Sequence, residues 1–194
     1  MSPAPFKIAF IGSHGVGKTT LCYGLAARLK ARDVSCEVVH EVARRCPLPI
    51  NRDTTYAAQA WILHTQIAEE LVAGARYPVV LCDRSALDNF VYLLLAAERE
   101  PALERLVDAW MPTYSLLIDV PIVDSPAPDG IRAADPGFQR AVEERLRREL
   151  VRRGIATLRL DAGGRPRWLD VAEDAALALL RPPQLSLLDE PARD

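Results

Sequence analysis

Hydrophobic and polar residues along this chain are grouped in blocks that differ in length and period. Short runs that are apolar throughout predict buried strands. These runs are Lys7–Gly12, Cys36–His40, Pro78–Asp83, Tyr114–Val120 and Ile155–Leu160. Strands that are apolar on both faces are typical of a parallel sheet with helices on each side. The pattern therefore predicts an α/β fold with a five-stranded parallel sheet and helices on both faces.

The segments between these runs have helical spacing. Leu21, Leu25 and Leu29 lie four residues apart, which predicts a first helix that starts at Gly17. A long second helix is expected from Asp53, as its N-cap, to Gly74, as its C-cap. Its predicted apolar stripe consists of Tyr56, Ala60, Leu63, Ile67 and Leu71. Further helices are expected at Ala86–Glu98, at Pro101–Trp110, from Asp135-Pro136 onward and at Trp168–Leu180.

Length and composition indicate one soluble domain. The 194 residues are 49% hydrophobic and 26% charged, so residues 1–181 are expected to fold together, with residues 182–194 as a C-terminal tail. The net charge of −2 gives no overall attraction to nucleic acid or anionic membranes. We expect a cytoplasmic protein, because no apolar run reaches the roughly 20 residues of a membrane span and the N-terminus does not resemble a secretory signal. The four cysteines lack C-x-x-C spacing, which favours reduced thiols over a zinc site.

In a parallel sheet of this kind, ligands bind beyond the carboxyl ends of the strands. Several polar residues fall at or just after those predicted ends: the stretch Gly12–Lys18, then Glu41, Asp83 and Asp119. This placement predicts the position of the site independently of any motif, although a structural role is the simpler interpretation for Asp119.

The segment after the first strand fits the phosphate-binding pattern G-x-x-x-x-G-K-[ST]. Its residues, with the one that follows, are Gly12, Ser13, His14, Gly15, Val16, Gly17, Lys18, Thr19 and Thr20. Glycines let the backbone curl so that its N–H groups point at phosphate oxygens, and the next helix adds its positive end. Lys18 is placed to reach the β- and γ-phosphates of ATP, Thr19 to ligate Mg²⁺ and Thr20 to reach the α-phosphate. The alternative is an ordinary glycine-rich turn, and His14 is expected to be a variable position.

Asp83 closes the third predicted strand. A carboxylate there can hold Mg²⁺, usually through water, or orient an attacking hydroxyl; its alternative role is to cap a helix. Arg84 follows it where motor-type ATPases usually carry a second carboxylate. The two asparagines, Asn51 and Asn89, do not precede lysines, so the N-K-x-D sequence of GTPases is missing. Both of these classes are therefore disfavoured.

The motifs GSHGVGKTT, HEVAR, CDRS and DGIR, taken in order, resemble those of the P-loop nucleoside and nucleotide kinases. This group includes deoxynucleoside kinases, thymidylate kinases, the nicotinamide riboside kinase domain and AAA-like ATP-binding kinase domains. The resemblance spans roughly Lys7 to Leu160. It implies a P-loop NTPase fold with a lid at about 122–140, the cofactors ATP and Mg²⁺, and transfer of the γ-phosphate to a hydroxyl group.

The resemblance also implies roles for individual residues. Glu41 is similar to the glutamate that accepts the proton of the substrate hydroxyl, with pairing to Arg44 or Arg45 as the alternative. Arg84 resembles the arginine that contacts the substrate or the transferring phosphate. Two lid arginines, Arg132 and Arg140, would close on ATP and neutralise developing charge. Asp88 and Tyr92 are expected either to contact substrate or to serve in capping and the core.

The acceptor follows less directly from these motifs. The stretch Arg44–Trp61 is expected to form much of its wall and offers Tyr56, Gln59 and Trp61 for stacking or hydrogen bonding to a ring, although a core helix uses the same aromatics. HEVARR departs from the E-P-x of deoxynucleoside kinases, and CDRS departs from their E-R-S. A nucleoside-like or nucleotide small molecule is the leading acceptor, and a polynucleotide end is the other.

The tail carries a separate signal. Gln184–Leu188 reads QLSLL, which resembles the peptide by which bacterial replication and repair proteins bind the DNA sliding clamp. A second hypothesis follows: an ATP-hydrolysing regulatory or DNA-maintenance module that its tail recruits to the clamp. Arginines between Arg145 and Arg153 could bind nucleic acid, but the glutamates among them favour a solvated helix face.

Overall fold

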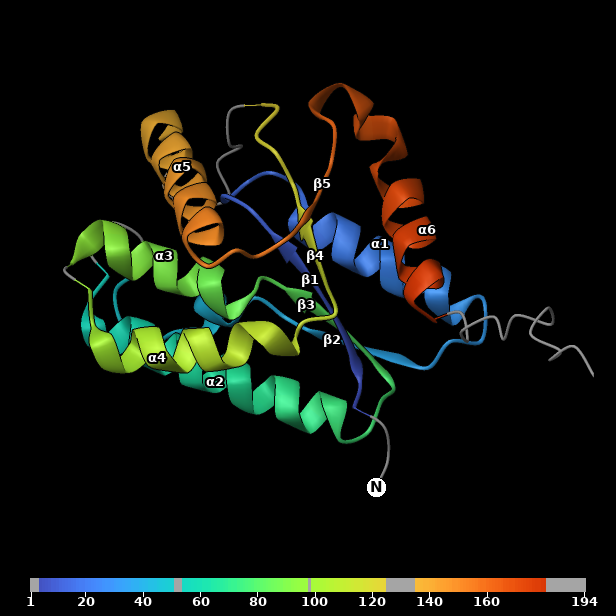
Figure 1. The fold of residues 1–194 in the computed structure, drawn as a ribbon, viewed down its shortest axis with the longest axis horizontal. Helices are drawn as coiled ribbons and strands as arrows, with labels where there is room; N and C mark the ends of the chain where they lie inside the picture. Colours follow the sequence, from blue (N-terminus) through green and yellow to red (C-terminus); the bar gives the residue numbers. More distant parts are fainter. Residues whose placement is uncertain (1–3, 51–53, 98, 125–134, 181–194) are drawn as a thin grey trace, which may run out of the picture.

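The computed structural model describes residues 4–50, 54–97, 99–124 and 135–180. Five parallel strands form one sheet in the order β2-β3-β1-β4-β5 (Figure 1). The strands are β1 (Phe6–Ile11), β2 (Cys36–Val39), β3 (Val79–Asp83), β4 (Leu116–Asp119) and β5 (Leu158–Arg159). The predicted α/β fold and its parallel sheet are confirmed, while the last strand is a two-residue fragment of the predicted Ile155–Leu160.

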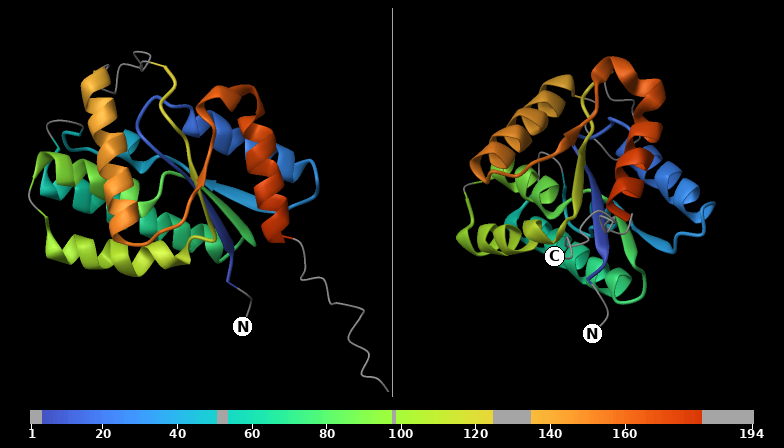
Figure 2. Two further views of the ribbon diagram at one scale, coloured as in Figure 1. Left: turned by 45° about the horizontal axis from the view of Figure 1, so that its top comes forward. Right: turned by 45° about the vertical axis from the view of Figure 1, so that its right-hand side comes forward.

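Helices cover both faces of this sheet. Figure 2 shows α1 and α6 together on one side and the remaining α-helices on the other. The α-helices are α1 (Lys18–Lys30), α2 (Tyr56–Gly74), α3 (Ala86–Ala96), α4 (Pro101–Trp110), α5 (Pro136–Arg152) and α6 (Trp168–Leu180). Short 3₁₀ turns, η1 (Val42–Arg45), η3 (Met111–Thr113) and η4 (Ala162–Arg167), connect them.

The central strand explains why there are two hydrophobic cores. Ile8 and Phe10 of β1 point toward α1 and α6, whereas Ala9 and Ile11 point toward the layer that contains α2 to α5. All four side chains are fully buried. Burial on both faces is what an uninterrupted apolar strand requires, and it leaves the strand ends as the place for polar chemistry.

Helix α2 differs from its prediction in two respects. It begins at Tyr56 with Thr55 as N-cap, whose side chain accepts a hydrogen bond from the backbone N of Ala58 at 3.2 Å; the predicted cap, Asp53, lies outside the described residues. The predicted apolar stripe is confirmed only in its middle: Leu63 is buried and Ala60 and Ile67 pack against the core, whereas Tyr56 and Leu71 are 50% and 58% exposed. The buried face instead carries polar side chains, Gln59, Gln66 and Glu70, beside its apolar ones. The predicted C-cap, Gly74, is the last helical residue.

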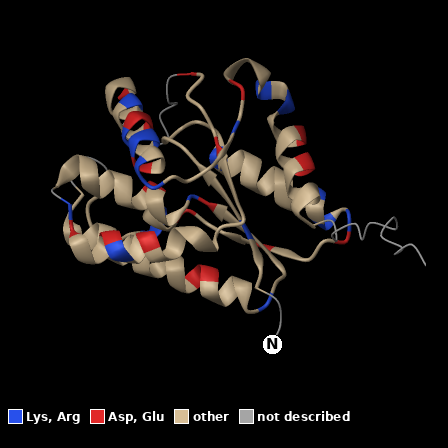
Figure 3. Cartoon of the chain, viewed as in Figure 1, with Lys and Arg blue, Asp and Glu red and all other residues tan. Residues whose placement is uncertain are grey.

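Most charged residues lie on helices and loops, and each strand carries a single one (Figure 3). On α5, positive and negative side chains are interspersed, and Glu143–Arg147 and Glu144–Arg148 form ion pairs at 2.9 and 3.5 Å. Within the described ranges, none of the helices combines the length and the apolar composition that a bilayer span needs.

Candidate active site

The loop after β1 has the backbone of a phosphate nest. Gly12, Gly15 and Gly17 have φ values of +135°, +73° and +97°, in a region that side chains disfavour. A Cβ on Gly12 would lie 2.5 Å from the carbonyl oxygen of Val120, so this position has no room for a side chain. Gly17 is the N-cap of α1 and makes no side-chain capping bond. The first N–H groups of α1 therefore have no side-chain cap at the expected phosphate position.

Lys18 is 3% exposed and folds back over this loop. Its Nζ donates to the carbonyl oxygen of Gly12 at 2.9 Å and to that of Ser13. Burial lowers the pKa of Lys18 to about 7, the positive charge of Arg84 adds to this effect, and the carboxylates of Asp88, Asp83 and Glu41 oppose it. A phosphate placed here would supply the negative charge that favours the ammonium form.

Thr19 and Asp83 meet at the carboxyl ends of β1 and β3. The Thr19 hydroxyl donates to Oδ2 of Asp83 at 2.6 Å. Both oxygens are hard donors of the kind that Mg²⁺ prefers. The described residues contain no group of three or more His, Cys, Asp and Glu side chains that could hold a metal. This pair fits a Mg²⁺ ion that takes its other ligands from phosphates and water, and so Thr19 and Asp83 would hold it.

Arg84 and Glu41 form a buried ion pair beside the loop. Arg84 Nε donates to Glu41 Oε1 at 2.7 Å, and both residues are more than nine-tenths buried. Arg44 Nε donates to the other oxygen of Glu41 at 2.8 Å, while Arg45 pairs with Glu69. The pairing alternative for Glu41 is therefore present, and it places Glu41 between Arg44 and Arg84.

Asp88 has a positioning role that explains its burial. Its Oδ2 accepts from the Ser85 backbone N at 3.0 Å and the Ser85 hydroxyl at 2.6 Å, and Ser85 in return caps the N–H of Asp88. Its Oδ1 accepts from the backbone N of Gly12 at 2.9 Å. The capping interpretation is thus the one observed, and the cap also ties α3 to the phosphate loop. Asp119 pairs with Arg159 at 2.6 Å, which supports its structural role.

The first turns of α5 pack on the other side of the loop. Gln139 Nε2 donates to the backbone carbonyl oxygen of His14 at 2.9 Å. The backbone carbonyl oxygen of Gln139 accepts from the Ser13 hydroxyl at 2.7 Å. The His14 ring lies against Tyr92 and Phe138. The side chains of Ser13 and His14 are therefore engaged by the protein, which leaves their backbone N–H groups as the expected phosphate contacts. Gln139 gave no signal in the sequence, because a glutamine in a helix is usually solvated.

A narrow pocket lies beside Glu41 and Arg84. Its polar lining residues are His14, Glu41, Arg44, Gln59, Arg84, Asn89 and Tyr92. Two buried polar atoms within it, Gln59 Oε1 and Arg84 Nη1, have no hydrogen-bond partner among the described residues. The pocket volume of about 30 Å³ matches one water molecule. A nucleoside-sized acceptor would therefore have to displace side chains such as Arg44, which is 38% exposed.

The remaining predicted residues have different outcomes. Thr20 is exposed at the start of α1, and Arg140 is exposed in the first turns of α5. Residues 136–140, the end of the predicted lid, are helical. Arg132 and the centre of that lid lie outside the described residues, as does Gln184–Leu188. Of the three candidates for ring recognition, Gln59 lines the pocket and Tyr56 and Trp61 do not.

Comparison with known proteins places this geometry in a family. A model described as an AAA domain matches residues 7–167. The chain belongs to the AAA domain family. The match covers β2 to β5, all of β1 except its first residue, and the whole phosphate loop. No curated protein sequence matches the chain.

Solved structures share the P-loop kinase fold of this AAA domain. NadR in complex with NAD and AMP-PNP is 21% identical with a TM-score of 0.66, and the match covers 94% of this chain and 52% of that one. NadR in complex with NR gives 22% identity, a TM-score of 0.61 and coverage of 80% and 45%. Deoxyadenosine kinase from M. mycoides with bound dATP gives 13% identity, a TM-score of 0.58 and coverage of 90% and 98%. The chain spans about half the length of the NadR chains.

Proposed function

We propose that this AAA domain is a phosphotransferase that uses ATP and Mg²⁺ to phosphorylate a hydroxyl group of a nucleoside-like or nucleotide small molecule. The observation that carries the proposal is the position of the narrow pocket. Glu41 and Arg84 line it, and Asp83, the neighbour of Arg84, bonds Thr19 of the phosphate loop. An acceptor in the pocket would therefore present its hydroxyl next to a bound triphosphate. Similar structures hold AMP-PNP and dATP, which supports nucleotide binding here.

Phosphoryl transfer depends on positioning and charge neutralisation. Lys18 and the N–H groups of the loop would hold the β- and γ-phosphates, and Thr19 and Asp83 would hold Mg²⁺, which neutralises phosphate charge when bound. Glu41 or Asp83 would accept the proton of the acceptor hydroxyl. Arg84 would stabilise the transferring group. Arg132 and Arg140 are proposed to contribute charge from the lid.

The pocket favours an acceptor with both hydrogen-bond donors and acceptors. Gln59 Nε2 donates to Thr54 Oγ1 at 2.7 Å, and its buried oxygen is left as an acceptor for a ligand in the pocket that Gln59 lines. Arg84 Nη1 is a buried donor in the same pocket. A nucleobase edge, with N–H and C=O groups side by side, satisfies both atoms, whereas an apolar ligand would leave them unsatisfied at a cost of about 1–3 kcal/mol each.

The test is incubation with ATP, Mg²⁺ and a panel of nucleosides, nucleotides and 5′-hydroxyl oligonucleotides, with detection of the phosphorylated acceptor. We expect transfer to a small acceptor and at least a hundredfold loss in Lys18→Met, on the order expected for a lost charge-stabilising group. Gln59→Leu should raise KM for the acceptor and leave KM for ATP unchanged. Tyr56→Leu, an exposed change on the same helix, is the matched control.

Release of free phosphate without transfer to any acceptor would contradict the proposal. That result would favour the ATP-hydrolysing regulatory or DNA-maintenance module instead. Transfer to oligonucleotide ends alone would identify a polynucleotide-end kinase. Binding of the sliding clamp by Gln184–Leu188 stays a prediction from the sequence.

A further inference from the structure

Behind the pocket, a buried carboxylate on α2 collects four hydrogen bonds. Glu70 is 1% exposed. Its Oε2 accepts from Lys7 Nζ at 2.9 Å and Trp110 Nε1 at 2.7 Å, and its Oε1 accepts from the Tyr114 hydroxyl at 2.7 Å and Gln66 Nε2 at 3.0 Å. The donors come from β1, from the end of α4, from the short segment between η3 and β4 and from α2. Glu70 is therefore a fixed point of the layer that carries α2, α3 and α4.

Gln66 connects this fixed point to the candidate active site. It is 2% exposed and lies one turn before Glu70 on the buried face of α2. The same Nε2 that bonds Glu70 donates to the backbone carbonyl oxygen of Arg84 at 2.8 Å. The Oε1 of Gln66 accepts from Asn89 Nδ2, on α3. Both amide hydrogens and the amide oxygen are used, so the orientation of the Gln66 side chain is fixed by its neighbours.

Arg84 needs such a restraint because its backbone is strained. Its φ is +112°, and it is one of two non-glycine residues with positive φ in the described chain. Arg84 lies between Asp83, which bonds Thr19, and Ser85, which caps α3. It therefore sets the direction in which the Asp83 and Arg84 side chains leave the end of β3. Strained backbone persists only when surrounding contacts over-determine it.

We propose that Gln66, anchored by Glu70, is a positioning residue that holds the strained Arg84 peptide and so aims the Arg84 guanidinium at the Glu41 pair and the pocket. The inference rests on the proposed function only for its kinetic consequence. Gln66 does not itself line the pocket, but it bonds two residues that do, Arg84 and Asn89, so its effect reaches the reaction through them. The roles of Gln66 and Glu70 could not be predicted from the sequence, where both residues look like solvated positions of an amphipathic helix.

The test is a double-mutant cycle between Gln66→Met and Arg84→Gly. Met keeps the length of the side chain and removes its donors, while Gly adopts positive φ without strain and lacks the guanidinium. In the wild-type background, Gln66→Met should lower kcat about tenfold, as for a lost buried hydrogen bond, and change KM for ATP less than about twofold. In the Arg84→Gly background it should not lower kcat further. Val72→Met, on the exposed face of α2, is the control.

Unfolding in urea gives a second readout that needs no activity. Gln66→Met should lower the urea midpoint less in the wild-type background than in Arg84→Gly, because relaxation of the strained peptide in the wild type offsets part of the lost hydrogen-bond energy. Equal losses in both backgrounds would overturn the proposal, since Gln66 would then be a general core residue. A Gln66→Met single variant that does not fold would likewise overturn it, because relaxation of the strained peptide is expected to limit the loss. A coupled loss of stability in a protein without transferase activity would support the positioning role and refute the proposed function.

Discussion

At the scale of single residues, the phosphate loop was predictable because its chemistry depends on residue type. Gly12 has no room for a Cβ, Lys18 supplies a buried charge and Thr19 supplies a hydroxyl, and no common alternatives perform these tasks. Gln59 was predicted as a candidate for ring recognition and lies in the pocket. Gln66, Glu70 and Gln139 were not predictable, because burial gives these side chains their roles and their sequence context resembles a solvated helix face.

Alanine substitutions at two glycines of the loop would distinguish the cost of steric crowding from the cost of backbone strain. Gly12→Ala would place a methyl group 2.5 Å from the Val120 oxygen at a φ of +135°, whereas Gly17→Ala meets nothing within 4 Å at a φ of +97°. We expect Gly12→Ala to lower the free energy of unfolding by about 3 kcal/mol and Gly17→Ala by only about 1 kcal/mol. Urea unfolding of the nucleotide-free variants measures both. Equal losses would mean that the β1 loop shifts away from β4 at no cost.

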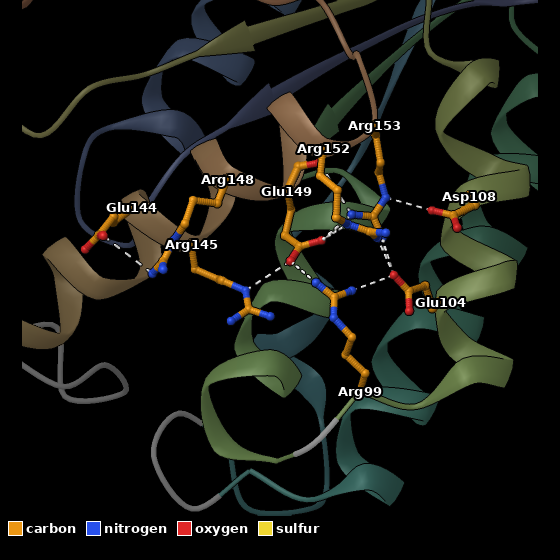
Figure 4. Close-up of polar contacts among 9 residues, drawn as sticks. All are labelled: Arg99, Glu104, Asp108, Glu144, Arg145, Arg148, Glu149, Arg152 and Arg153. Carbon is orange, nitrogen blue, oxygen red and sulfur yellow. Dashed lines mark hydrogen bonds and ion pairs between the residues drawn. The ribbon is translucent and has the colours of Figure 1, made fainter.

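At the scale of elements, the sequence predicted which segments are strands and which are helices. It did not predict the contacts that the charged helix faces make. The apolar runs identified every strand, and Pro136 after Asp135 correctly predicted the start of α5, where Asp135 accepts from Gly137 N at 2.8 Å. The arginines of α5 had suggested either nucleic-acid binding or a solvated face. Figure 4 shows a third arrangement, in which arginines of α5 and of its C-cap, together with Arg99, converge on Glu149. Glu149 accepts from Arg99, Arg145, Arg152 and Arg153.

This cluster joins α5 to α4. Arg152 and Arg153 also pair with Glu104, and Arg153 pairs with Asp108 at 2.7 Å. Burial alone would raise the pKa of Glu149, but hydrogen bonds from Arg153, Arg152 and Arg99 outweigh it and lower the pKa to about 2. The guanidinium groups are engaged in the fold, so they are poorly placed to bind phosphates of a nucleic acid.

The cluster predicts a specific dependence of stability on pH. The folded-state pKa of Glu149 is about 2 and its ordinary value is 4.5, so its contribution is full above pH 4.5 and is lost as pH falls toward 2. Glu149→Gln should therefore lower the free energy of unfolding by about 3 kcal/mol at pH 7, and the difference from wild type should shrink between pH 4.5 and 2. Urea unfolding at a series of pH values measures this.

Glu144→Gln, one turn earlier on α5, is the matched control. Its side chain is 71% exposed and meets Arg148 at 3.5 Å. Such a pair contributes less than about 1 kcal/mol. Equal effects of the two substitutions, or a Glu149 effect that persists undiminished at the lowest pH, would show that the cluster does not stabilise the fold through the Glu149 charge.

At the scale of the whole molecule, the candidate site draws on elements far apart in the sequence. Lys18 and Thr19 come from α1, Asp83 and Arg84 from the β3–α3 junction, and Gln139 of α5 holds the back of the loop. The parallel sheet made this convergence predictable, because all five strands end at one edge. The size of the narrow pocket was not predictable, since it depends on how the buried Arg84–Glu41 pair packs against α2.

A ligand held by several elements should stabilise the entire fold. Since the triphosphate is expected to bind only the folded loop, ATP with Mg²⁺ at a hundred times its Kd should add about 2.7 kcal/mol to the free energy of unfolding. For a chain of this size, that corresponds to a rise of roughly 5–10 °C in Tm. Lys18→Met should show a much smaller rise at the same concentration, because it removes the buried ammonium that the phosphates would face. Differential scanning fluorimetry with ATP, with Mg²⁺ alone and with both measures the effect, and an identical Tm for wild type under all three conditions would refute nucleotide binding at this site.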